Sequence, residues 1–129
     1  MNKYAVMLAV LMAATGCKAP QFILGAEQEG VSVSYRWNHR PEKPSELLLK
    51  ITNNAPSARQ VHVEIDLSHQ ALTVEQFTAD TCIPAGRTFN GKLNGIYFVP
   101  QHLTPAQAAS SDTKVELTRL ETAGVESCR

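Results

Sequence analysis

Short runs of alternating apolar and polar residues constrain the fold of this chain more than any other feature. The clearest run covers residues 59–67, where Val61, Val63, Ile65 and Leu67 alternate with polar side chains. Such a period of two is typical of a strand that buries one face and exposes the other. No segment shows the pattern of a long amphipathic helix. The chain is therefore predicted to fold as an all-β domain.

Weaker forms of the same pattern recur along the chain. With 59–67, the predicted strands are 31–38, 46–52, 71–78, 88–93, 96–99 and 113–120. In 71–78 we expect Leu72 and Val74 to face the core. Asn94-Gly95 suits a type I′ hairpin turn because both residues tolerate positive φ, and Asn90-Gly91 is a second candidate. Thr104-Pro105 predicts the N-cap and first position of a single helical turn that ends near residue 109.

About seven short strands at this spacing favour a single small antiparallel β-sandwich, or a small barrel. The segments 47–54 and 61–65, followed by the bend at 84–86, resemble an immunoglobulin-like or fibronectin-III-like module. The resemblance covers residues 45–100 and implies that Trp37 belongs to the core; a surface tryptophan that stacks on a ligand is the alternative. The cysteines do not flank Trp37, so the inter-sheet cystine of antibody domains is absent.

The N-terminus has the layout of an export signal. Lys3 precedes an uncharged run over residues 4–15, which is shorter than the roughly 20 apolar residues of a membrane span. The run ends in Ala14-Thr15-Gly16-Cys17, which resembles a bacterial lipobox. The resemblance implies cleavage before Cys17 and acylation of its thiol; an ordinary signal peptide with a chance cysteine is the alternative.

This interpretation divides the chain into a signal peptide (1–16), a lipid-anchored tether (17–30) and the β-sandwich domain (31–129). The expected partner of the anchor is a membrane, because several acyl chains on one residue hold a protein firmly. Lys18 stands where many lipoproteins of Gram-negative bacteria have the aspartate that retains them in the inner membrane. The outer membrane is therefore favoured.

Of the three cysteines, Cys17 directly follows the predicted signal peptide, and the other two lie in the predicted domain. If Cys17 carries lipid, Cys82 and Cys128 remain, and two cysteines in an exported chain indicate one disulfide. Two separate thiols are the alternative. No CxxC motif is present, which removes support for a thioredoxin-like role and for a zinc ribbon.

Composition and motifs narrow the function. Twelve basic and twelve acidic residues leave no basic excess, which argues against a nucleic-acid partner. The 43% hydrophobic content is sufficient for a packed core. No nucleophile motif, P-loop or dinucleotide fingerprint occurs, so no catalytic residue and no cofactor are predicted.

His62, Glu64 and Asp66 share one strand face but lie too far apart to hold a metal without a second strand, and a solvated face is favoured.

Arg36, Trp37, His39 and Arg40 are the predicted contact residues for a ligand or partner, at the end of one strand. An anionic sugar or phosphate suits their chemistry, and a solvated loop is the alternative.

The leading hypothesis for the function of the protein is a non-enzymatic accessory or binding module in an envelope assembly. The alternatives are a lipoprotein that binds glycan or peptidoglycan through Trp37, Tyr97 and Phe98, an inhibitor that uses loop 39–45 or 100–112, and a periplasmic metal handler.

Overall fold

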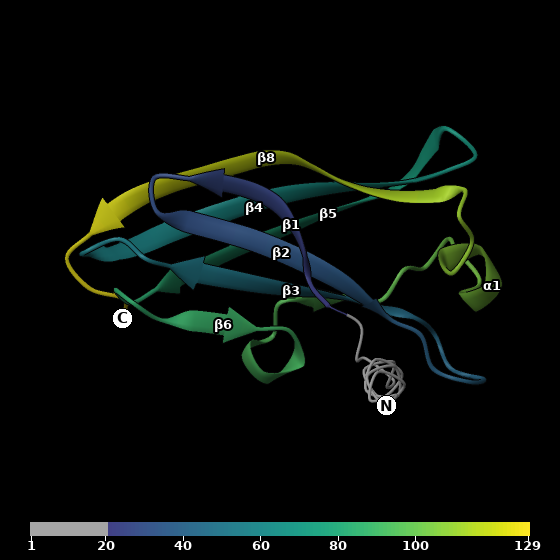
Figure 1. Ribbon diagram of the computed structural model, residues 1–129, viewed down its shortest axis with the longest axis horizontal. Helices are drawn as coiled ribbons and strands as arrows, with labels where there is room; N and C mark the ends of the chain where they lie inside the picture. Colours follow the sequence, from purple (N-terminus) through teal and green to yellow (C-terminus); the bar gives the residue numbers. More distant parts are fainter. Residues whose placement is uncertain (1–20) are drawn as a thin grey trace, which may run out of the picture.

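The computed structural model describes residues 21–129, which form two antiparallel sheets packed face to face (Figure 1). One sheet has the order β1-β2-β3, with β6 and β7 both paired to β3, and the other has the order β5-β4-β8. The strands are β1 (Ile23–Gln28), β2 (Val31–Asn38), β3 (Glu46–Asn53), β4 (Ala58–His69), β5 (Leu72–Ile83), β6 (Thr88–Asn90), β7 (Tyr97–Phe98) and β8 (Thr113–Val125). The predicted all-β fold is confirmed, whereas the predicted signal peptide and Cys17 lie outside the described residues.

The core lies between the two sheets and follows from the alternation in the sequence. Every second residue of β4 from Val61 to Leu67 is at most 1% exposed. The residues that face them from the other sheet are equally buried and come from β2 and β3: Val31, Val33, Leu47, Leu49 and Ile51. Trp37 is partly buried and packs against this core, as predicted.

Strand β8 keeps its apolar residues toward the core by means of a bulge. Val115 and Leu117 lie opposite Leu67 and Ile65, and the pairing shifts before Leu120 lies opposite Val63. The extra residue explains why the apolar spacing changes from two to three at this point. The strand then continues to Val125, beyond the predicted end at residue 120.

The predicted tether of residues 17–30 is wrong where the structure describes it, because Ile23–Gln28 form the edge strand β1. Strand β1 pairs with β2 from Ile23 opposite Tyr35 to Gln28 opposite Val31. The two-residue loop between them, Glu29-Gly30, has φ of 51° and 84°. This is the geometry of a type I′ hairpin, which continues the twist of the paired strands.

The predicted hairpin at Asn94-Gly95 is also wrong, because β6 and β7 pair with β3 and not with each other. The 3₁₀ helix η2 (Lys92–Asn94) connects them, and Gly95 ends it with a φ of 73°. The type I′ positions belong instead to Gln70 and Ala71 between β4 and β5, with φ of 52° and 67°.

Of three further predictions, one is wrong and two are confirmed. Leu72 was expected to face the core but is 71% exposed at the start of β5. Helix α1 (Pro105–Ala108) is confirmed, with Thr104 as its N-cap in a reciprocal pair of hydrogen bonds with Gln107. The predicted disulfide is also confirmed, and it joins Cys82 of β5 to Cys128, with the two Cα atoms 5.5 Å apart.

Candidate functional site

The four predicted contact residues do not converge on one site. Trp37 turns toward the core and stacks on the ring of His39, with the ring centroids 5.5 Å apart. His39 shares a hydrogen bond of 2.8 Å with the Ser45 hydroxyl across its own loop. Arg36 lies instead on the outer face of the β1-β2-β3 sheet, where its guanidinium carbon is 5.3 Å from the centre of the Phe22 ring.

Arg40 lies apart from both the Trp37–His39 pair and Arg36, next to the buried carboxylate of Glu46. Glu46 is only 3% exposed and accepts hydrogen bonds or ion pairs from Lys92 at 2.8 Å, Asn38 at 2.9 Å and Arg40 at 3.5 Å. Its pKa is lowered mainly by Lys92, with Asn38 and Arg40 acting in the same direction against the effect of burial. This cluster binds loop 39–45 to the sheet, so Arg40 has a structural partner within the chain.

The three aromatic residues proposed for glycan stacking do not form one platform. Tyr97 and Phe98 are neighbours on β7 and therefore point to opposite faces of the sheet. Phe98 stacks on Phe77 with centroids 4.4 Å apart, in contact with the core, and Trp37 also packs there. Tyr97 is 36% exposed, and the Lys92 ammonium lies 5.6 Å from the centre of its ring.

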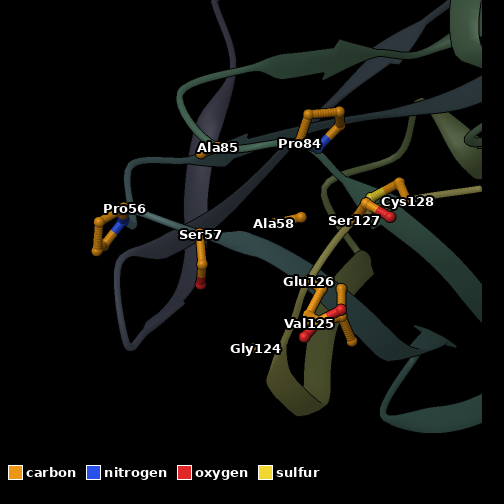
Figure 2. Close-up of a pocket in the computed structure, with 10 residues that line it drawn as sticks. All are labelled: Pro56, Ser57, Ala58, Pro84, Ala85, Gly124, Val125, Glu126, Ser127 and Cys128. Carbon is orange, nitrogen blue, oxygen red and sulfur yellow. The ribbon is translucent and has the colours of Figure 1, made fainter.

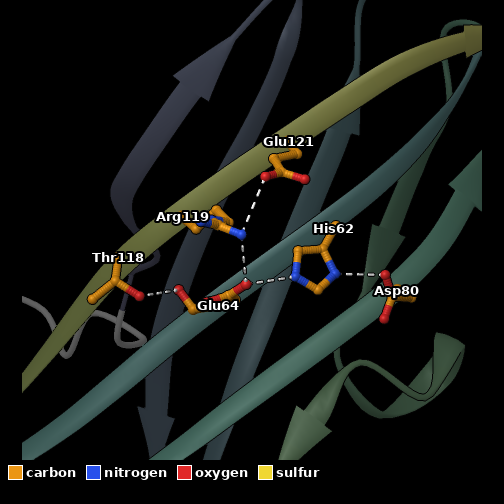
Figure 3. A network of polar contacts seen from close by, with 6 residues as sticks. All are labelled: His62, Glu64, Asp80, Thr118, Arg119 and Glu121. Atoms are coloured by element: carbon orange, nitrogen blue, oxygen red, sulfur yellow. Dashed lines mark hydrogen bonds and ion pairs between the residues drawn. The ribbon is translucent and has the colours of Figure 1, made fainter.

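The outer face of the β5-β4-β8 sheet carries a polar network centred on His62 (Figure 3). The His62 Nδ1 atom lies 2.6 Å from an Asp80 oxygen, and Nε2 lies 2.9 Å from a Glu64 oxygen. Arg119 reaches the same Glu64 at 3.5 Å and Glu121 at 3.4 Å. Two ring nitrogens that both face carboxylates favour the doubly protonated imidazolium, because only that form donates from both atoms.

Hydrogen bonds to Glu64 first, and to Asp80 second, raise the pKa of His62. A raised folded-state pKa stabilises the fold fully below the unfolded pKa, and this stabilisation is lost as the pH rises through the folded value. We therefore expect His62→Gln to lower the free energy of unfolding more at about pH 5.5 than at about pH 8.5. Urea unfolding at both pH values measures this difference.

His69→Gln is the matched control for that experiment. His69 also lies on β4, but the partner of its Nδ1 atom is the Thr113 hydroxyl at 2.8 Å and not a carboxylate. The change in the free energy of unfolding that His69→Gln causes at each pH is the reference for the change that His62→Gln causes. A loss for His62→Gln that stays constant or grows toward alkaline pH contradicts the prediction.

A shallow groove lies beside the disulfide, at the end of the two sheets (Figure 2). The segment from Gly124 to Cys128 forms one wall, and residues 56–58 and 84–85 form the other. Most of the groove is lined by backbone and small side chains. Glu126 is the one lining residue with a charged side chain. The groove could therefore accommodate a ligand, but its side chains would make few hydrogen bonds or ion pairs with it.

A second hollow lies on the outer face of the β1-β2-β3 sheet. Its lining combines the aromatic ring of Phe22, the ammonium of Lys50 and several hydroxyl groups; the full set is Gln21, Phe22, Ser32, Ser34, Lys50 and Thr52. The Lys50 nitrogen lies 5.6 Å from the centre of the Phe22 ring. This hollow was not predicted, because Phe22 lay in the predicted tether and the other lining residues after it lay in two separate predicted strands.

Among residues 21–129, no group of three or more histidine, cysteine, aspartate or glutamate side chains is arranged to hold a metal ion. None of the helical segments in this part of the chain has the length and apolar character that a bilayer crossing requires. The chain was also compared with protein-family models, with curated proteins and with solved structures, and none of the three comparisons found a match.

Proposed function

We propose that this chain is a bacterial envelope lipoprotein, anchored through Cys17 in the outer membrane, whose β-sandwich serves as a non-enzymatic accessory or binding module. The observation that carries the proposal is the division of the three cysteines. Cys82 and Cys128 are joined in the folded domain, so Cys17 is the cysteine that remains for another role. That residue ends the small-residue run that resembles a lipobox, and a disulfide is typical of exported proteins.

The sandwich is proposed to be of the immunoglobulin-like type. In the immunoglobulin fold, whose strands are lettered in chain order, strand B lies between A and E, and strand C lies between C′ and F. Here β3 corresponds to B, because it lies between β2 and β6. Strand β4 corresponds to C, because it lies between β5 and β8. The disulfide differs from that of antibody domains, because it joins β5 to the C-terminal tail and does not cross the core.

A binding role is supported by the outer face of the β5-β4-β8 sheet. Five carboxylates point outward there according to the strand register: Glu64, Asp66, Asp80, Glu116 and Glu121. The basic residues on the same face are Arg119, Lys114 and the protonated His62, so the five carboxylates still leave an acidic excess. Such a face attracts a partner with a basic surface and aligns it during association.

Mass spectrometry of the protein extracted from bacterial membranes with detergent tests the anchor. We expect the N-terminal peptide to begin at Cys17 and to carry the mass of attached acyl chains. The matched control is Cys17→Ala, which is expected to retain residues 1–16 and to lack the acyl mass. A wild-type chain that is cleaved without acylation, or that keeps residues 1–16, contradicts the proposal.

Cross-linking in intact cells, followed by co-purification, tests the assembly role. We expect a specific partner to be enriched with the wild-type protein and reduced with Glu116→Lys/Glu121→Lys, which reverses two charges on the acidic face. Glu42→Lys in loop 39–45 is the control, because Glu42 is exposed and lies outside both sheets. Recovery of the wild-type protein with no enriched partner, or equal capture by all variants, contradicts the role.

A further inference from the structure

The outer face of the β1-β2-β3 sheet combines cationic and apolar side chains next to the predicted anchor. We call Phe22, Leu24, Arg36 and Lys50 the basic face. Leu24, Ser34 and Lys50 form one row across the three strands, because Ser34 pairs with Leu24 on one side and with Lys50 on the other. Phe22 lies over both cations, at 5.3 Å from Arg36 and 5.6 Å from Lys50.

The apolar members of this face are accessible to solvent to different degrees. Leu24 is 60% exposed, and Phe22 is half-buried beside the two cations. Aromatic and aliphatic side chains beside Lys and Arg match the chemistry of a membrane interface, where the apolar parts enter the headgroup layer and the cations meet phosphates. The Ser32, Ser34 and Thr52 hydroxyls beside Lys50 add hydrogen-bond donors for phosphate oxygens.

The two outer faces of the sandwich differ in charge. The β5-β4-β8 face presents five carboxylates against Arg119, Lys114 and the protonated His62. On the opposite side, the cations Arg36, Lys50 and Lys92 outnumber the carboxylates Glu27 and Glu46, and Glu46 is paired with Lys92 at 2.8 Å. An anionic lipid surface therefore attracts the basic face and repels the acidic face.

The length of the connecting chain brings this face close to the anchor. Cys17 precedes Gln21 by four residues, and four residues of fully extended chain span at most about 14 Å. Gln21 and Phe22 both line the hollow on the basic face. Acyl chains on Cys17 would thus hold the domain with this face within reach of the lipid headgroups in any conformation of the connecting residues.

We propose that the basic face rests on the headgroups of anionic phospholipids, with the acidic face directed away from the membrane. This inference rests on the proposed acylation of Cys17. Each Lys or Arg near an anionic surface favours the docked orientation by about fivefold, and Glu27 on the same face opposes one of the two cations, so we expect a net preference of about fivefold. The docked orientation places Lys50 at the lipid surface and leaves Lys114, on the outer face of β8, in water.

Acetylation of lysines, read by mass spectrometry, tests the orientation on the full acylated protein. The protein is reconstituted into vesicles of phosphatidylglycerol and phosphatidylcholine in roughly equal amounts, and into vesicles of phosphatidylcholine alone. We expect Lys50 to react about fivefold more slowly on the anionic vesicles, while the rate of Lys114 stays unchanged. Salt at about 1 M is expected to remove the difference, because it shortens the screening length to about 3 Å.

Two variants connect the protection to the named side chains. Arg36→Gln is expected to remove most of the protection of Lys50 on anionic vesicles, and Arg119→Gln on the acidic face is expected to leave it intact. The free protein with inorganic phosphate is a further arm. Equal protection of Lys50 by phosphate alone would assign the hollow to a free anion and overturn the docking proposal.

The same spectra distinguish the failure of the two proposals. If Cys17 carries no acyl mass, both the proposed function and this inference are overturned. If Cys17 is acylated but Lys50 and Lys114 react equally on both vesicles, the anchor stands and the orientation is overturned. Selective protection of Lys114 also overturns it, because the acidic face would then lie on the membrane.

Discussion

Replacing Cys128 with serine is expected to lower the free energy of unfolding by about 4 kcal/mol. The disulfide joins residues 46 positions apart, and cross-linking a loop of that length removes much of the entropy of the unfolded chain. The bond also holds the tail after Val125 against the end of β5, and this tail is part of one wall of the groove in Figure 2. Urea unfolding of the oxidised wild type and of the variant measures the loss.

Ser127→Ala is the matched control for the disulfide, since it changes the neighbouring residue without touching the bond. Reduction of the wild-type protein is expected to reproduce the loss seen with Cys128→Ser, and Ser127→Ala is expected to change stability by less than about 0.5 kcal/mol. A loss below about 1 kcal/mol in both the reduced protein and the Cys128→Ser variant contradicts the prediction.

Asn53→Ala is expected to cost about 3 kcal/mol, because it leaves several buried polar groups without partners. Asn53 is fully buried, and its Nδ2 group donates to the carbonyls of Ile83 at 2.9 Å and Ser57 at 3.0 Å. Its Oδ1 atom accepts from the Ala55 amide at 2.9 Å. One side chain thus connects the turn after β3 with the bend after β5, and thermal or urea unfolding measures its contribution.

Two variants make the Asn53 experiment specific. Asn54→Ala is the control, because Asn54 is exposed and its backbone bond to Gly30 does not depend on the side chain. Asn53→Asp is expected to destabilise at least as strongly as Asn53→Ala, because a carboxylate of the same size cannot donate to the Ile83 and Ser57 carbonyls. Near-wild-type stability of Asn53→Asp would show that the donated bonds contribute little.

The disulfide and Asn53 also matter for the proposed function, because both stabilise the frame of the module. The disulfide and Asn53 both act at the end of the sandwich that forms the groove, where residues 56–58, 84–85 and 124–128 gather. A rigid frame holds the two oppositely charged outer faces at fixed positions on opposite sides of the core. That arrangement is what a module needs if one face meets lipid and the other meets a protein.

Much of the fold could be predicted from local patterns. Strand β4 was identified from its alternation of apolar and polar residues. In a strand with one solvated face, apolar side chains lie on the buried face and polar side chains on the exposed face. The N-cap at Thr104 was equally readable, since capping depends on residues within one turn. The disulfide followed from counting cysteines in an exported chain.

Strand β1 was missed because its pattern is irregular. Its pairing with β2 shifts between Leu24 and Ala26, which breaks the alternation, and Ile23 and Leu24 both remain exposed. The Asn94-Gly95 hairpin was predicted from a dipeptide preference that competes with pairing elsewhere. Both β6 and β7 pair with β3 in the same direction, so the two glycine-containing turns lie in a segment that interrupts one edge strand and do not form a hairpin.

The sequence by itself therefore determined the strand class, the faces of the central strands, the disulfide and the expectation of a lipid anchor, because each depends on neighbouring residues or on simple counting. Only the tertiary structure decided which polar residues meet. Glu46 and Lys92, and likewise His62 and Asp80, are distant in sequence and contact each other through strand register or loop packing. The separation of charge onto two faces arises in the same way, since register places Arg36 beside β3 and Asp80 beside β4.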